Sequence, residues 1–157
     1  MNLFRQRGSI AAVVRVIRFG LPTAEEAHIP PEVMRAAQMK KGIVLVTGSA
    51  GSGKSTTLAC IINEINRTRT GHILTLEDPV EYIHRHDKCI VSQREIGCDC
   101  PSYVAALRSA LRESPDVILL GEMRDKETME VAMTAAETGQ LLSLIHISEP
   151  TRLLSIS

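Results

Sequence analysis

Residues 43–55 read IVLVTGSAGSGKS, and this stretch decides the fold. The apolar residues 43–46 predict a strand buried on both faces of a parallel sheet. Residues 48–55 match the pattern G-x-x-x-x-G-K-[ST], and the spacing of Leu58, Ile61 and Ile65 predicts a helix directly behind it. Glycines between a strand and a helix let backbone N–H groups turn toward a phosphate at the helix N-terminus. We therefore expect a nucleoside triphosphate to bind here. The alternative is a Gly/Ser-rich turn before a helix.

The residues of this loop differ in what they are expected to contact. Lys54 is expected to reach the β- and γ-phosphates, and the Ser55 hydroxyl to take a place on Mg²⁺. The predicted nucleotide contact comprises Gly48, Ser49, Ala50, Gly51, Ser52, Gly53, Lys54, Ser55 and Thr56. The predicted ligand is therefore a nucleoside triphosphate with its magnesium ion.

Strands and helices alternate along the rest of the chain. Apolar runs at 73–76 and 117–120 predict two further buried strands. Helices are predicted between residues 102 and 113 and after Asp125, which can cap its helix. This alternation predicts an α/β fold with a doubly wound, mainly parallel sheet, in which ligands bind at the carboxyl ends of the strands.

The residues before Gly42 have a different pattern. Gly8 and Ser9 form a turn signal next to the β-branched run 10–17, which predicts a hairpin. Residues 19–31 contain three prolines and read as a linker, and a short helix is predicted from Pro31. The main domain is therefore expected to begin at Gly42.

Composition excludes several classes of function. The 157 residues carry 18 Lys+Arg and 18 Asp+Glu, and zero net charge argues against a bulk polyanion binder. No apolar run approaches 18 residues, so no transmembrane helix is expected. Four cysteines without an export signal indicate reduced thiols and a cytoplasmic protein, and the C-x-C at 98–100 lacks the second ligand pair of a zinc site. The histidines with no shared helical spacing are expected in loops or on the surface: His28, His72, His84 and His86.

Acidic residues follow two of the predicted strands. Glu77, Asp78 and Glu81 come after 73–76, and Glu122 comes after 117–121. In a parallel sheet both groups lie at the same edge as the phosphate loop, where phosphoryl transfer needs a carboxylate near Mg²⁺ and a group that orients water. The usual pattern has Asp directly after the strand, whereas Gly121 and Glu122 stand here. The alternative is that these acids are solvated loop residues or helix caps.

Five segments resemble the secretion/pilus ATPase superfamily: residues 42–66, 72–82, 91–97, 107–128 and 135–139. The resemblance covers about residues 3–142. Within the superfamily, residues 92–96, 121–125 and 136–138 are more similar to the retraction ATPases of type IV pili, which serve twitching motility, than to pilus-assembly or type II secretion ATPases.

The resemblance implies a RecA-like P-loop NTPase core that hydrolyses ATP, preceded by the last hairpin of a PAS-like α+β domain. It implies that Glu122 is an atypical Walker B glutamate acting on Mg²⁺ through water, that Glu77 is the general base, and that Arg15 reaches nucleotide phosphate. It also implies a homohexameric ring at the cytoplasmic face of the inner membrane, where it moves a platform protein. Nucleic acid is not an expected partner.

The two ends depart from the family pattern. Gln140 replaces the first His of the family's His box, and residues 143–157 resemble a translated sequencing adapter or a frame-shifted tail. The alternative is that 141–147 is the next buried strand. We therefore expect four parts: a remnant of the N-terminal domain (1–18), a linker with a short helix (19–41), a partial core (42–142) and a non-native tail (143–157).

Truncation at both ends predicts weak nucleotide binding and little or no hydrolysis, because the ring surfaces and arginines are incomplete. Three other functions stay open. They are a pilus-assembly or type II secretion ATPase, a non-catalytic nucleotide-binding fragment, and a nucleic-acid-dependent P-loop ATPase. Zero charge and few aromatic residues weigh against the last.

Overall fold

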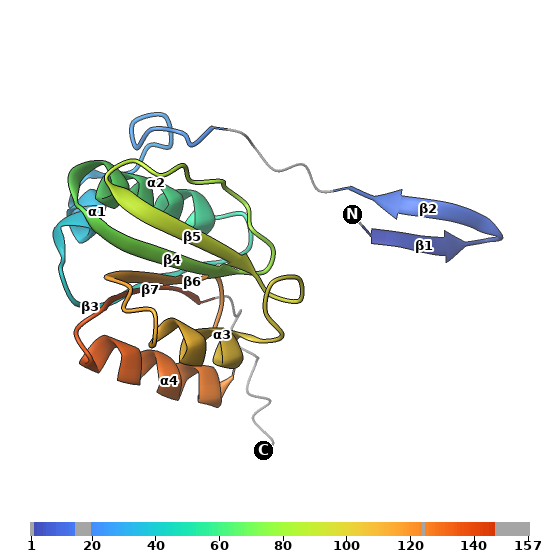
Figure 1. The fold of residues 1–157 in the computed structure, drawn as a ribbon. Helices are drawn as coiled ribbons and strands as arrows, with labels where there is room; N and C mark the ends of the chain where they lie inside the picture. The colour runs from blue at the N-terminus through green and yellow to red at the C-terminus, as the bar shows by residue number, and fades with distance from the viewer. Residues whose placement is uncertain (1, 15–19, 124, 147–157) are drawn as a thin grey trace, which may run out of the picture.

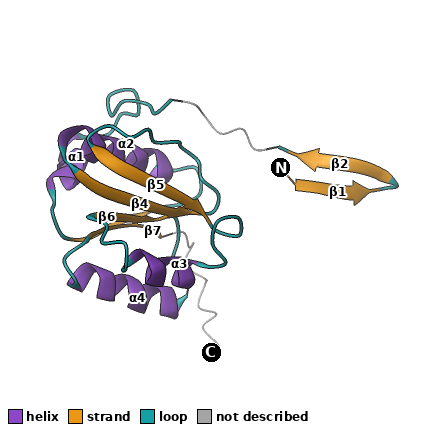
Figure 2. Ribbon diagram, viewed as in Figure 1, coloured by secondary structure: helices purple, strands orange, loops and turns teal. Residues whose placement is uncertain are grey.

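The computed structural model describes residues 2–14, 20–123 and 125–146, and Figure 1 shows their arrangement. Arg15 and residues 147–157 therefore lie outside the described residues. A central sheet lies between two helical layers, and a separate hairpin precedes it (Figures 1 and 2). The hairpin consists of β1 (Asn2–Gln6) and β2 (Ser9–Val13), which pair antiparallel as the turn signal predicts.

The sheet contains β3 (Gly42–Thr47), β4 (Gly71–Glu77), β5 (Cys89–Glu95), β6 (Val117–Leu120) and β7 (Leu141–His146). Its strand order is β3-β7-β6-β4-β5, and every pairing is parallel. The predicted α/β fold with a parallel sheet is confirmed.

Helices cover both faces of the sheet. The short α1 (Pro31–Met34), a 3₁₀ turn (Arg35–Gln38) and α2 (Lys54–Thr68) lie on one face, and α3 (Tyr103–Ala110) and α4 (Lys126–Glu137) lie on the other (Figure 2). Pro31 is the first residue of α1. The N–H at that position would have no partner within the helix, so proline, which lacks an N–H, costs nothing there. Asp125 caps α4 by accepting from the Thr128 N–H at 2.7 Å, as predicted.

Two hydrophobic cores follow from the alternation of side chains along the central strands. On β4, Ile73 packs toward α2, whereas Leu74 packs toward α3 and α4. On β6, Leu119 and Leu120 divide in the same way. Because successive side chains point to opposite faces, a strand covered on both sides is mostly apolar, and Thr75 is the polar exception within 73–76. This rule explains why 73–76 and 117–120 were recognisable.

One prediction about the edge of the sheet is wrong. Among the described residues β3 stands at one edge of the sheet, where Ile43 is 37% and Leu45 59% exposed, so the run 43–46 is not buried on both faces there. The opposite edge, β5, was not predicted at all. Its apolar part is only residues 89–91, and Ile90 is itself exposed, so no continuous apolar run marks the strand.

Residues 141–146 complete the sheet. β7 lies between β3 and β6, so the position of these residues agrees with the alternative that 141–147 is the next strand. The expected boundary between 142 and 143 falls inside β7. The expectation of a foreign tail concerns the coding DNA and stays a prediction. Among the described residues, no helix is long and apolar enough to cross a membrane.

Candidate functional site

The loop 48–53 connects β3 to α2 with backbone angles that favour glycine. Gly53 is the N-cap of α2 and has φ 89°, in the left-handed region. At Gly48 an added Cβ would lie 2.7 Å from the Ser52 side-chain oxygen. Gly53 therefore needs glycine for its left-handed backbone, and Gly48 because the loop folds back closely on this position.

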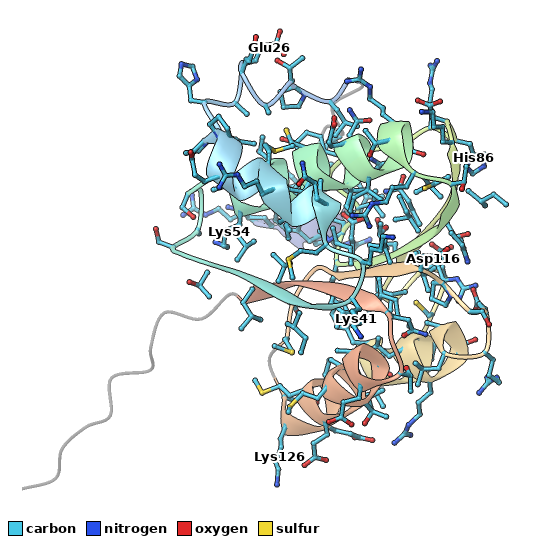
Figure 3. All side chains as sticks on the ribbon, turned by 90° about the vertical axis from the view of Figure 1, so that its left-hand side faces the viewer. Glu26, Lys41, Lys54, His86, Asp116 and Lys126 are labelled. Carbon is cyan, nitrogen blue, oxygen red and sulfur yellow. The ribbon has the colours of Figure 1, made fainter. Side chains whose placement is uncertain are left out.

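Lys54 directs its charge into this loop. The residue is only 7% exposed, and its Nζ donates hydrogen bonds to the carbonyl oxygens of Gly48 (2.8 Å) and Ser49 (2.6 Å). Figure 3 labels this side chain at the start of α2. A buried ammonium beside the N–H groups of a helix N-terminus concentrates positive potential, so the loop can attract a phosphate.

A small cavity adjoins the loop at the carboxyl end of the sheet. Its volume is about 60 Å³, and its lining includes Ser55, Glu77, Glu81 and Glu122. Ser55 comes from α2, Glu77 from the last position of β4, Glu81 from the segment after β4, and Glu122 from the segment after β6. The structure therefore brings together the hydroxyl and the carboxylates that were expected to meet at this edge.

Glu77 is a largely buried carboxyl group that takes part in a hydrogen-bond network. Its Oε1 accepts hydrogen bonds from the Thr75 hydroxyl (2.6 Å) and from Gln93 Nε2 (3.3 Å). Burial raises the pKa of Glu77, while these two hydrogen bonds act in the opposite direction. A carboxylate of raised pKa that stays hydrogen-bonded in a cavity is suited to accept a proton.

The ends of β6 and β4 approach each other closely at Gly121. Its N–H donates to the Leu76 carbonyl at 2.7 Å, which extends the pairing of β6 with β4. An added Cβ would lie 3.1 Å from Glu77 Cα, closer than ordinary van der Waals contact. The glycine therefore lets the two strand ends approach, and Glu122 reaches the same cavity as Glu77.

The sequence alone did not identify Tyr82 and Gln93 as residues of this site. Tyr82 OH and Thr56 Oγ1 lie 2.8 Å apart, which ties the segment after β4 to the first turn of α2. Gln93 Nε2 donates to the Tyr82 carbonyl at 2.8 Å. Gln93 lies on β5, the strand that was not predicted. Only the apolar start of that strand, at 89–91, could have signalled it.

Of the histidines expected in loops or on the surface, His72 instead lies on β4 and is half-buried, whereas His84 lies in a loop as predicted but is buried. It is 9% exposed, and burial lowers its pKa to about 4. The residues that follow it, 85–88, are all polar, so nothing in the local sequence indicated that it is buried. His28 and His86 are exposed, as expected.

Other candidate residues do not join the site. Arg15 lies outside the described residues, so its expected contact with phosphate stays a prediction. All four cysteines are free thiols. Within the described ranges, no group of three or more His, Cys, Asp or Glu side chains is arranged to hold a metal ion.

Comparison with known proteins establishes the family. The family model described as "Type II/IV secretion system protein" matches residues 13–155, nearly the whole chain. The chain belongs to the type II/IV secretion system protein family. The resemblance to the retraction ATPases of type IV pili, stated from the sequence, is therefore confirmed at the level of the family and by the relatives below.

Relatives within the type II/IV secretion family include pilus motors. The twitching motility protein of Neisseria gonorrhoeae is 51% identical over 142 residues, which are 90% of this chain and 38% of that protein. The type IV pilus retractation ATPase PilT of Pseudomonas aeruginosa is 50% identical over 142 residues, with 90% and 41% coverage. The type II secretion system protein E of Xanthomonas campestris is 42% identical over 131 residues, with 80% and 22% coverage.

Solved structures of the type II/IV secretion family share the fold. The pilus retraction motor PilT with bound ADP superposes with a TM-score of 0.89 at 50% identity, over 94% of this chain and 43% of that one. The Legionella pneumophila ATPase DotB gives a TM-score of 0.80 at 32% identity, with 96% and 47% coverage. This chain therefore spans less than half the length of the relatives that it matches.

Proposed function

We propose that this chain is the nucleotide-binding part of an ATP-hydrolysing motor of the pilus-retraction type. The observation that carries the proposal is the cavity beside the phosphate loop, which Ser55, Glu77 and Glu122 line together. Phosphoryl transfer needs a phosphate cradle, a metal-side group and a group that orients water, and the three side chains can supply the last two. One relative named as a type IV pilus retractation ATPase (50% identical) and one named as a twitching motility protein (51% identical) support the same assignment.

Each residue has a distinct task in this proposal. Lys54 and the N–H groups of residues 48–56 hold the phosphates of ATP, and Glu77 takes a proton from the attacking water. The Ser55 hydroxyl and, through water, the Glu122 carboxylate hold Mg²⁺, and these hard oxygen donors fit that ion. When bound, Mg²⁺ supplies neutralisation of charge on the phosphates.

The wider assembly is proposed from the family resemblance. The core is RecA-like, and the β1–β2 hairpin is the end of a PAS-like domain. Six copies form a ring at the cytoplasmic face of the inner membrane, where Arg15 contacts nucleotide and the ring moves a platform protein.

The test combines a binding assay with a sensitive assay of chemistry. A fluorescent ATP analogue measures affinity, and single-turnover hydrolysis with the protein in excess measures the rate. Lys54→Ala is expected to weaken binding at least tenfold, whereas Lys41→Ala, at an exposed lysine, should change nothing. Glu122→Gln and Glu77→Gln are expected to retain binding but to slow hydrolysis by about a hundredfold.

Three results would contradict the proposal. Binding that is indifferent to Lys54→Ala would exclude the phosphate loop. Hydrolysis that survives both glutamate substitutions would exclude the catalytic assignment. Hydrolysis stimulated by single-stranded DNA would favour a nucleic-acid-dependent ATPase instead.

A further inference from the structure

Gln93 is the residue of this site to which neither the motif nor the family resemblance gave a role. We propose that Gln93 is a positioning residue, which holds the Glu77 carboxylate in its orientation and ties it to the phosphate loop. The inference rests on the proposed function, because it concerns the group assigned there as the base. Gln93 itself acts through Glu77 and is not proposed to touch the nucleotide.

The register of the sheet places Gln93 beside Glu77. Gln93 on β5 pairs with Thr75 on β4, so their side chains share a face, and Glu77, two residues after Thr75, lies on the same face. Thr75 is fully buried, and its hydroxyl and the Gln93 amide both donate to Glu77 Oε1. Two donors from adjacent strands thus converge on one carboxylate oxygen.

Both the nitrogen and the oxygen of the Gln93 side-chain amide form hydrogen bonds. Its nitrogen donates to Glu77 Oε1 at 3.3 Å and to the Tyr82 carbonyl at 2.8 Å, while its oxygen accepts from the His84 N–H at 2.8 Å. Turning the amide over would set its oxygen against two acceptors and its nitrogen against a donor. The network therefore determines the orientation of the amide. A glutamate, a leucine or a shorter asparagine could not satisfy the same three partners.

The same amide links the carboxylate to the phosphate loop. Gln93 holds Tyr82 through the backbone, and the Tyr82 hydroxyl contacts the Thr56 hydroxyl at 2.8 Å. Thr56 follows Ser55 directly in the first turn of α2. Hydrogen bonds therefore connect Thr56, in the helical turn that follows the phosphate loop, through Tyr82 and Gln93 to Glu77. Gln93 is bonded to both Tyr82 and Glu77. Polar networks of this kind limit movement when every member is satisfied.

Kinetics of four variants test the inference. Gln93→Leu keeps the approximate volume and removes all three hydrogen bonds. It is compared with Glu77→Gln, with the double variant, and with Ser92→Ala as a matched control. Ser92 is the next residue on the same strand, and its hydroxyl contacts His72 Nε2 at 3.0 Å, away from Glu77. Circular dichroism and urea unfolding check that each variant folds.

We expect Gln93→Leu to lower the single-turnover rate about tenfold or more, because small misplacements of a catalytic group have effects of this size. Affinity for the fluorescent ATP analogue should change less than twofold, and Ser92→Ala should match the wild type in both assays. In the Glu77→Gln background, Gln93→Leu should slow hydrolysis no further, since a positioning residue has nothing left to position. An equal slowing in both backgrounds, or a loss of affinity instead of rate, would overturn the inference.

A spectroscopic measurement decides the contact independently of catalysis. The side-chain amide resonances of Gln93, observed by NMR in the protein without nucleotide, are expected to shift on Glu77→Gln and to stay in place on Asp78→Asn. Insensitivity to Glu77→Gln would overturn the inference whatever the ATPase assay shows. A wild type without hydrolysis would instead count against the proposed function, so the two failures are distinguishable.

Discussion

Replacing His84 by leucine should flatten the dependence of stability on acid pH. Burial lowers the pKa of His84 from 6.5 to about 4, and its Nδ1 is buried without a hydrogen-bond partner among the described residues. The folded protein therefore binds fewer protons than the unfolded chain between these two pH values. Stability from this group is fully present above pH 6.5, and it falls as the pH is lowered toward 4.

The size of the effect follows from the difference between the two pKa values. At about 1.4 kcal/mol for each pH unit, His84 makes the free energy of unfolding about 3 kcal/mol higher at neutral pH than in strongly acid solution. Over the more accessible interval from pH 7.5 to pH 5.0, the expected loss is about 2 kcal/mol. The wild type and His84→Leu have all other ionisable groups in common. The difference between the two proteins therefore isolates the effect of residue 84.

Urea unfolding at the two pH values measures this difference. The chain contains no Trp, so far-UV circular dichroism is a suitable probe. The free energy of unfolding of the wild type should fall by about 2 kcal/mol more than that of His84→Leu, with similar slopes against urea. Arg85→Leu, at an exposed residue of the same segment, should show the same pH dependence as the wild type. Equal pH dependence in wild type and His84→Leu would refute the reasoning.

Three further predictions concern the strand ends and a helix cap. Gly121→Ala should slow single-turnover hydrolysis about tenfold with little change in nucleotide affinity, since the new methyl group meets Glu77 Cα; an unchanged rate would contradict this. Glu77→Gln should stabilise the protein at pH 7.5, because burial raises the pKa of Glu77 and disfavours its charged form. The gain should vanish below about pH 4, where Glu77 is protonated in the folded and in the unfolded protein. Urea unfolding that finds the variant no more stable than the wild type at pH 7.5 would count against this account. Asp125→Ala should lower the free energy of unfolding in the same assay, because Thr128 N and Oγ1 lose their acceptors, whereas Asp125→Asn should retain most of it; equal losses would exclude a capping role.

The parts of the site that could be predicted are those that a short segment or a general rule of parallel sheets determines. The phosphate loop is contiguous, so glycine conformation, Lys54 and the helix N-terminus follow from eight adjacent residues. Glu77 and Glu122 were placed at one edge because the carboxyl ends of parallel strands coincide. Their shared cavity confirms the expected proximity, while their catalytic roles stay proposals.

The parts that were missed depend on pairing between distant segments. Gln93 meets Glu77 only because β5 pairs with β4 in one register, and a shift by one residue would turn Gln93 to the other face. His84 is buried because the segment after β4 turns back toward that strand pair, where its backbone N–H donates to Gln93. Neither contact leaves a pattern in the residues near it.

By itself, the amino-acid sequence determined the α/β class, the phosphate loop and the capped helix at Asp125, since each depends on interactions within a few residues or on a buried strand's apolar run. Tertiary structure alone decided that β3 is an exposed edge and that Gly121 leaves room for Glu77. It also decided that Gln93 joins the carboxylate to the phosphate loop. The physical reason is that strand order and register are set by the packing of the whole sheet, and the energy of that packing is distributed over two cores.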